Sequence, residues 1–170
     1  MFHLQTYIYF PVHNPSFPED IPVDDTDTLG KAEPYLDFER LQGHIELSYH
    51  GQPILTEEYW DFIVEYWSYL IDLIEGFMEN GFGKIYFPDQ QISISVKEQG
   101  PNWVLMTISD IEVIGKWLLP REELMKTLTD GAIRFFKGLS EAFSDSVNRQ
   151  YRFKDVYKEC LELKRRYFGE

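Results

Sequence analysis

The histidines and carboxylates of one predicted strand come nearest to a chemical site. Residues 43–50 alternate in polarity, which predicts a half-buried strand with one face on a core. His44, Glu46 and His50 then share the wet face. Six residues of strand span about 20 Å, so the two imidazoles are too far apart to ligate one metal ion. This face therefore predicts the edge of a small-ligand pocket and no metal site.

Two other patterns lack residues that their chemistry needs. The stretch 25–30 is similar to the start of a calcium loop, but Leu29 and Leu36 stand where oxygen ligands are required. Cys160 falls on the apolar side of a predicted helix, where a cysteine is inert rather than nucleophilic. The chain has no P-loop, nucleophile elbow or dinucleotide fingerprint. The sequence therefore predicts no cofactor and disfavours an enzyme.

The strongest pattern is a run of carboxylates at helical spacing. A helix is predicted from about residue 57 to residue 80, with Thr56 as its N-cap and Gly81 as its C-terminal stop. One side of it, the predicted acidic face, carries Ser68 and six carboxylates, Glu58, Asp61, Glu65, Asp72, Glu75 and Glu79. Because like charges four residues apart destabilise a helix, an unmixed face predicts a surface that docks a basic partner protein.

The predicted acidic face is also compatible with two roles that need no partner. The first role is a solvated surface. The second is internal pairing with a basic helix predicted over about 150–167. Residues 1–120 carry 20 Asp and Glu against 5 Lys and Arg, whereas residues 121–170 carry 9 against 11. The negative charge therefore belongs to the first two thirds of the chain, and the cations that could neutralise it lie at the end.

The overall charge limits the partners and the compartment. A net charge of −13 repels nucleic-acid phosphates and anionic membranes, so neither is predicted as a partner. Charges interrupt the most apolar helical stretch, 59–78, which argues against a membrane span. The single cysteine and an N-terminus without signal-peptide features predict a cytoplasmic protein.

The order of the elements predicts the fold class. Apolar alternation and helical periodicity place strands at 4–12, 35–42, 43–50, 84–97, 102–109 and 111–118, and helices at about 57–80, 120–143 and 150–167. A Pro- and Asp-rich loop is expected at 13–34. Strands in clusters, separated by helices, predict a single α+β domain over 1–170 with a mostly antiparallel sheet packed against about three helices.

Two segments carry a resemblance to a known group of proteins. These are the run from Gly43 to Leu55, followed directly by the acidic helix, and the strands of 84–118 that lead through Trp117-Leu118-Leu119-Pro120 into a helix. In this layout, over about 43–143, the chain resembles small acidic immunity-type proteins of bacterial polymorphic toxin systems and related uncharacterised bacterial families. The resemblance implies a cytoplasmic, non-enzymatic inhibitor that covers the active surface of a toxin.

Three functions follow from these observations. The first is an immunity-like or inhibitor-like binding protein whose predicted acidic face docks a basic partner. The second is a small-ligand-binding or enzymatic domain with a pocket between sheet and helices, edged by His44, Glu46 and His50. The third is an oligomeric structural module in which surplus aromatic residues, Trp60 among them, cover a subunit interface.

Overall fold

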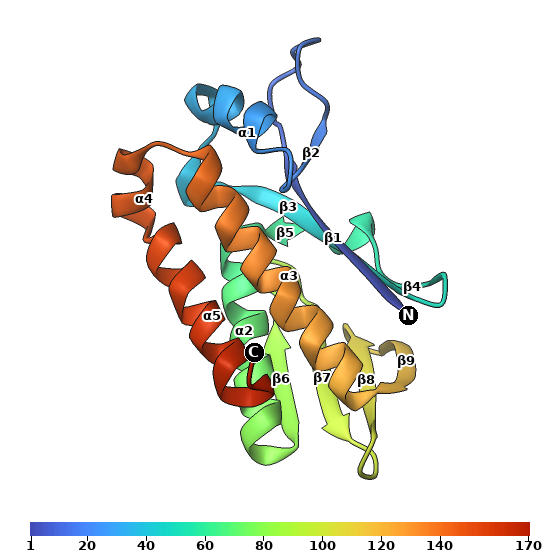
Figure 1. The fold of residues 1–170 in the computed structure, drawn as a ribbon. Coiled ribbons are helices and arrows are strands. Elements are labelled where there is room, and N and C mark those ends of the chain that lie inside the picture. Colours follow the sequence, from blue (N-terminus) through green and yellow to red (C-terminus); the bar gives the residue numbers. More distant parts are fainter.

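The chain forms two antiparallel sheets and five α-helices, and the computed structural model describes all 170 residues (Figure 1). Sheet A has the order β2-β1-β3-β4, formed by Asp20–Pro22, Phe2–Tyr9, Gln42–Tyr49 and Gln52–Leu55, and β5 (Asp61–Phe62) also pairs with β3. Sheet B has the order β6-β7-β8-β9, formed by Phe82–Tyr86, Ser93–Glu98, Trp103–Ser109 and Val113–Pro120. The helices are α1 (Thr26–Ala32), α2 (Ile63–Asn80), α3 (Arg121–Ala142), α4 (Asp145–Tyr151) and α5 (Phe153–Phe168). The predicted α+β class is confirmed, with five helices in place of about three.

Two long helices connect the sheets into one core. Helix α2 packs on the inner face of sheet B, so closely that a Cβ on Gly83 would lie 2.4 Å from the carbonyl oxygen of Leu73. Helix α3 packs on β1 of sheet A and on α5. Trp67 of α2 is fully buried and donates its indole N–H to Thr6 Oγ1 of β1, at 3.2 Å. The buried apolar side chains form one connected cluster, so the two sheets share a core.

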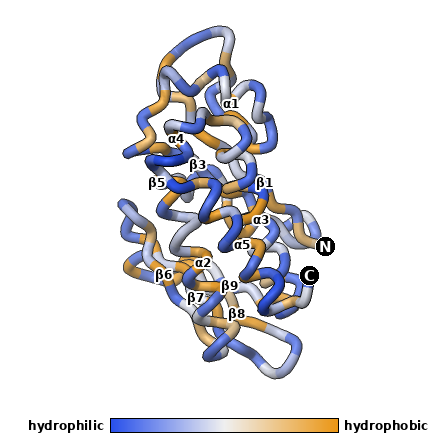
Figure 2. Tube along the Cα trace, turned by 60° about the vertical axis from the view of Figure 1, so that its left-hand side comes forward, coloured by the Kyte–Doolittle hydropathy of each residue, from blue (hydrophilic) through white to orange (hydrophobic).

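The hydropathy of the chain agrees with this packing. Figure 2 shows hydrophobic and hydrophilic residues alternating along the helices, as expected where one side of a helix faces a core. Strand β3 confirms the strand predicted at 43–50, with Ile45 and Leu47 buried. The strand expected at 84–97 is two strands, because a loop at 87–92 separates β6 from β7 and Phe87 N–H bonds to the Ile92 carbonyl across it.

The prediction of a strand at 35–42 is wrong. Two short 3-10 turns occupy 33–35 and 38–40, and β3 begins at Gln42. The carboxylate of Asp37 accepts a hydrogen bond from the backbone N–H of Glu39 at 3.0 Å. Such a local side-chain bond stabilises a turn in competition with a sheet ladder, which the apolar residues alone did not indicate.

The region expected as a loop at 13–34 contains β2 and α1. Asp25 caps α1 by accepting hydrogen bonds from the backbone N–H and the hydroxyl of Thr28. Leu29 on the inner side of α1 is fully buried. At Gly30 the helix approaches α3 so closely that a Cβ would lie 2.9 Å from the Ala142 carbonyl oxygen. Packing against α3 therefore orders a segment whose prolines and aspartates indicated a loop.

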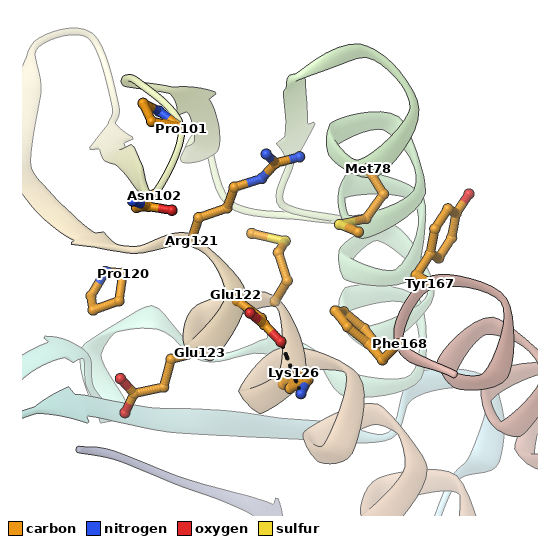
Figure 3. A pocket seen from close by; sticks show the side chains of 11 residues that line it. Met78, Pro101, Asn102, Pro120, Arg121, Glu122, Glu123, Lys126, Tyr167 and Phe168 are labelled. Carbon is orange, nitrogen blue, oxygen red and sulfur yellow. Dashed lines mark ion pairs between the residues drawn. The ribbon is translucent and has the colours of Figure 1, made fainter. Parts of the chain in front are cut away.

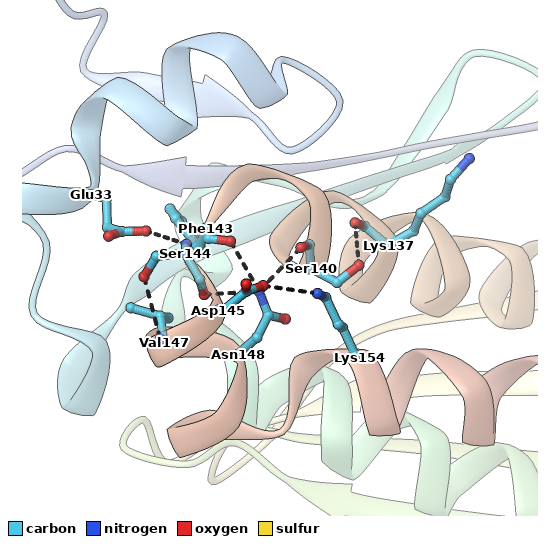
Figure 4. Close-up of polar contacts among 9 residues, drawn as sticks. All are labelled: Glu33, Lys137, Ser140, Phe143, Ser144, Asp145, Val147, Asn148 and Lys154. Carbon is cyan, nitrogen blue, oxygen red and sulfur yellow. Dashed lines mark hydrogen bonds and ion pairs between the residues drawn. The ribbon is translucent and has the colours of Figure 1, made fainter.

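A buried asparagine organises the junction that leads into the last helix (Figure 4). The Asn148 side-chain NH2 group donates to the carbonyl oxygens of Ser140, Phe143 and Ser144, at 3.0–3.2 Å. Ser144 in turn donates its backbone N–H to the carboxylate of Glu33. The predicted basic helix at 150–167 is divided here, since Arg152 adopts a left-handed conformation (φ 60°) between α4 and α5.

Helix α2 begins later than predicted. Thr56 accepts a hydrogen bond from the backbone N–H of Glu58, but it caps a 3-10 turn at 57–59 rather than the helix. The chain then forms β5, in which Asp61 pairs with Gly43 of β3, and helical geometry starts at Ile63. The predicted stop at Gly81 is confirmed, with φ at 72°.

One buried carboxylate joins the two sheets. Asp61 of β5 is fully buried and accepts backbone N–H bonds from Phe62, at 2.7 Å, and from Asp89 and Gln90, at 3.0–3.1 Å. The last two donors belong to the loop between β6 and β7 of sheet B. We call this set of hydrogen bonds the Asp61 junction. A buried carboxylate needs such donors because burial removes its hydration. Removal of the carboxylate would in turn leave three backbone N–H groups without their acceptor.

We therefore predict that Asp61→Ala lowers the free energy of unfolding by about 3 kcal/mol, since hydrogen bonds to a charged group contribute about 1.5–3 kcal/mol and the orphaned donors stay buried. Urea denaturation followed by circular dichroism measures this change. The control is Glu58→Gln, an exposed carboxylate three residues earlier, which should change stability by less than about 0.5 kcal/mol. Equal stabilities for the two variants would contradict the assigned role of the junction.

Candidate functional site

The structure removes two of the six carboxylates from the predicted acidic face. Glu58 lies in the 3-10 turn before β5 and is exposed, but it is not on the helix. Asp61 is fully buried in the Asp61 junction and cannot contact a partner. Both corrections have one cause, since the Asp61 side chain is held by sheet B and the helix can start only after it.

Four carboxylates remain along α2, and we call them the acidic stripe: Glu65, Asp72, Glu75 and Glu79. Asp72 and Glu79 are exposed, and Glu65 and Glu75 are half-buried. None of the four forms an ion pair. Partial removal from water raises the pKa of Asp72 above its ordinary value, because the charged carboxylate loses hydration that no cation replaces.

The basic C-terminal helix lies beside the acidic stripe without neutralising it. Tyr167 of α5 donates its hydroxyl to Glu79 Oε1 at 3.0 Å. The cations of α5 pair elsewhere: Lys164 contacts Asp130 of α3 at 2.9 Å, and Lys154 contacts Asp145 of α4 at 3.2 Å. Internal pairing, which the sequence left open, is therefore not found for the acidic stripe.

A cavity of about 380 Å³ lies on the outer face of sheet A, and we call it the His44 cavity. Its floor is β3 at Gly43 and His44, one wall is β1 and β2 with Tyr9, Glu19 and Asp20, and the other is the 57–60 segment with Glu57 and Trp60. The buried apolar side chains of β1 and β3 point to the opposite face, toward α3. The predicted pocket therefore exists beside His44, but on the open side of the sheet.

His44 is the most enclosed polar side chain of this cavity. It is 5% exposed, and its ring stacks on Tyr7 at a centroid distance of 4.9 Å. Its nitrogens form no hydrogen bond: Nε2 lies 3.5 Å from Glu46 Oε1, and Nδ1 lies 3.9 Å from Asp20 Oδ1. Burial, followed by the charges of Glu46 and Asp20, raises the pKa of the Tyr7 hydroxyl. Negative charge therefore surrounds an imidazole that still has free hydrogen-bonding capacity.

His50 does not belong to this site. It lies in the turn after β3 with φ at 48°, and its ring nitrogens are 3.2 and 3.4 Å from the N-terminal amine of Met1. Glu46 does lie beside His44, between the His44 cavity and a neighbouring hollow that also contains His3 and Glu57. Of the three residues predicted to edge a pocket, His44 and Glu46 are brought together and His50 is not.

Sequence reasoning missed most of the His44 cavity. Tyr9, Glu19, Asp20, Glu57 and Trp60 come from three separate segments. One available signal was the alternation of β1, which places Tyr7 and Tyr9 on one face of the strand. The register of β1 against β2 and β3 cannot be read from that alternation alone, and it decides that this face meets His44 and Asp20.

The outer face of sheet B has a different character. Its outward rows, defined by the strand registers, contain Phe82, Lys97, Leu105 and Leu118, then Lys84, Ser95, Thr107 and Lys116. Trp103 and Tyr86 are exposed at its two ends. We call these ten residues the sheet B face. It carries three of the five cations in residues 1–120 and no carboxylate.

A larger cavity, of about 710 Å³, lies where α2, α3 and α5 meet (Figure 3). Its charged side chains are already paired. Arg121 contacts Glu98 at 2.9 Å, and Lys126 contacts Glu122 at 3.0 Å and Glu170 at 3.5 Å. With its charged side chains paired, this cavity presents no free charge that would select a ligand.

The remaining side chains that could take part in chemistry form no catalytic arrangement. Burial raises the pKa of the Cys160 thiol to about 12, with a smaller contribution from Glu159, so at neutral pH the thiol is protonated. No cluster of three or more His, Cys, Asp or Glu side chains is arranged to hold a metal ion. None of the helices combines the length and apolar character needed to cross a membrane.

Comparison of the chain with protein-family models, with curated proteins and with solved structures gave no match. The resemblance to immunity-type proteins therefore stays a prediction. The features that bear on function are the acidic stripe, the His44 cavity and the sheet B face.

Proposed function

We propose that this chain is a non-enzymatic binding protein, of the immunity or inhibitor type, that docks a basic partner protein through the acidic stripe of α2. The observation that carries the proposal is that Glu65, Asp72, Glu75 and Glu79 have no cationic partner although a helix rich in Lys and Arg lies beside them. Unpaired carboxylates along one helix repel each other, and a basic partner would relieve that repulsion.

The physical effect of such a surface is mainly on encounter and specificity. A row of like charges attracts an oppositely charged protein over about a Debye length, which is about 8 Å at physiological salt. Two residues of α2, exposed Tyr69 and half-buried Ser68, lie among the carboxylates and add apolar and hydroxyl contacts. Association through this surface should therefore be fast at low salt and should weaken as salt increases.

We predict that the combined change Glu65→Gln, Asp72→Asn, Glu75→Gln and Glu79→Gln releases a basic protein that the wild-type chain captures from a lysate of its source cells. The four changes remove the attraction but keep side-chain size, so helix α2 should persist. The captured protein is identified by mass spectrometry, and its affinity is then measured by calorimetry at two salt concentrations. The affinity should fall by at least about tenfold in the variant.

A matched variant controls for net charge. Asp24, Glu141, Glu159 and Glu162, which are exposed and lie outside the acidic stripe, are changed to the corresponding amides. This control alters the total charge by the same amount and should retain the partner. Equal losses in the two variants, or binding that is insensitive to salt, would contradict docking through the acidic stripe.

Self-association is a second candidate function, and the sheet B face favours it. Leu118 is 54% exposed, and Phe82 and Trp103 are each nearly half exposed, so this sheet presents apolar surface to water. The lysines lie in the middle and at one end of the face, whereas Asp89, Asp110 and Glu112 lie in the loops at the other end. Two copies stacked with their strands in opposite directions would bring unlike charges together.

If this candidate is correct, the wild-type chain should sediment at twice its 20.2 kDa mass at micromolar concentration, and Leu118→Glu should sediment as the monomer. A buried carboxylate in the centre of such an interface would raise the dissociation constant at least about tenfold. Val12→Glu, at an exposed apolar residue of a distant loop, is the control. Sedimentation of the wild-type chain at 20.2 kDa would exclude this candidate.

A further inference from the structure

We propose that the His44 cavity is a binding site for a guanidinium group, namely the side chain of an arginine from a basic partner. The inference deepens the proposed function and rests on it for the source of the arginine, whereas the site itself is defined by its own geometry. The cavity volume of about 380 Å³ lies within the roughly 300–1,000 Å³ typical of ligand sites.

The charge of the cavity selects a cation. Glu19, Asp20 and Glu57 line it from opposite walls, Glu46 lies beside its floor, and no Lys or Arg lines it. An anionic ligand would therefore face several carboxylates at close range. A bound cation would reduce the repulsion among these carboxylates. Because the recess is partly shielded from water, the attraction between the cation and the carboxylates would exceed that of an exposed ion pair.

His44 indicates that the ligand is a hydrogen-bond donor. The imidazole is 5% exposed and lines the cavity, and its nitrogens have only long contacts, Nε2 at 3.5 Å from Glu46 and Nδ1 at 3.9 Å from Asp20, which leave hydrogen-bonding capacity unused. A ligand that donates a well-formed hydrogen bond would complete the weak contacts of this ring, as is usual for an enclosed polar group. In its neutral form the ring offers one nitrogen as an acceptor, which an N–H group of the ligand can reach while other N–H groups contact the carboxylates.

The shape of the walls favours guanidinium over ammonium. A guanidinium is planar, donates from several edges in fixed directions and stacks on aromatic rings, whereas an ammonium is a point charge. Carboxylates stand on both walls of the cavity, and Trp60 and Tyr9 provide aromatic surface on opposite sides. Trp60 is positioned from sheet B, since the side-chain amide of Gln90 donates to its carbonyl oxygen.

The test uses a small probe and the full chain without any partner. N-acetyl-L-arginine methylamide is titrated into the isotope-labelled protein, and the indole N–H signal of Trp60 and the imidazole signals of His44 are followed by NMR. We expect saturable shifts of both residues with a dissociation constant of about 1 mM, as for a ligand with few contacts. The lysine analogue should bind several-fold more weakly.

Substitutions locate the probe. Glu57→Gln and Asp20→Asn should each weaken binding about tenfold, because each removes a charged acceptor. Glu162→Gln, at an exposed carboxylate of α5, should leave binding unchanged. Thermal denaturation and the amide spectrum establish that each variant is folded.

Two results would overturn the inference. One is the absence of saturable shifts at Trp60 and His44, and the other is an unchanged affinity in both Glu57→Gln and Asp20→Asn. Because the probe carries no partner protein, its failure leaves docking at the acidic stripe intact. Conversely, if no basic protein binds at the acidic stripe but the probe still binds, the proposed function is wrong and the guanidinium site stands.

Discussion

The buried carboxylate of Asp61 is the interaction on which the arrangement of this protein depends. It belongs to a two-residue strand of sheet A and accepts backbone N–H groups from the loop between β6 and β7 of sheet B. The same loop supplies Gln90, which bonds to the Trp60 carbonyl and so supports one wall of the His44 cavity. Because Asp61 faces inward, α2 starts at Ile63, and this sets which carboxylates of the chain form the acidic stripe.

The surface of the molecule is divided by charge. The acidic stripe and the His44 cavity are negative, whereas the sheet B face carries lysines among apolar residues. Negative charge that is neither paired internally nor mixed with cations costs stability, and a bound cationic partner would relieve that cost. This contrast is why we propose a basic partner for the negative surfaces and consider self-association separately for the sheet B face.

Local patterns in the sequence predicted a large part of the fold, and long-range contacts account for what they missed. The alternation over 43–50 and the helical period after Pro120 identified β3 and α3, because each signal lies within one continuous stretch of sequence. The start of α2 was predicted too early because the donors to Asp61 lie 28 and 29 residues further along the chain. Likewise, His44 was expected to be wet, and only the stacking of Tyr7 and the crossing of the 57–60 segment enclose it.

We infer that a cationic partner docks on the negative surfaces of this chain. The most direct test is to map the amide chemical-shift changes that the captured partner, or a short arginine-containing peptide derived from its surface, causes in the isotope-labelled protein. We predict that the largest changes follow the exposed side of α2 and the residues around His44, Glu57 and Trp60. Changes concentrated on the sheet B face, around Lys84 and Lys116, would contradict it.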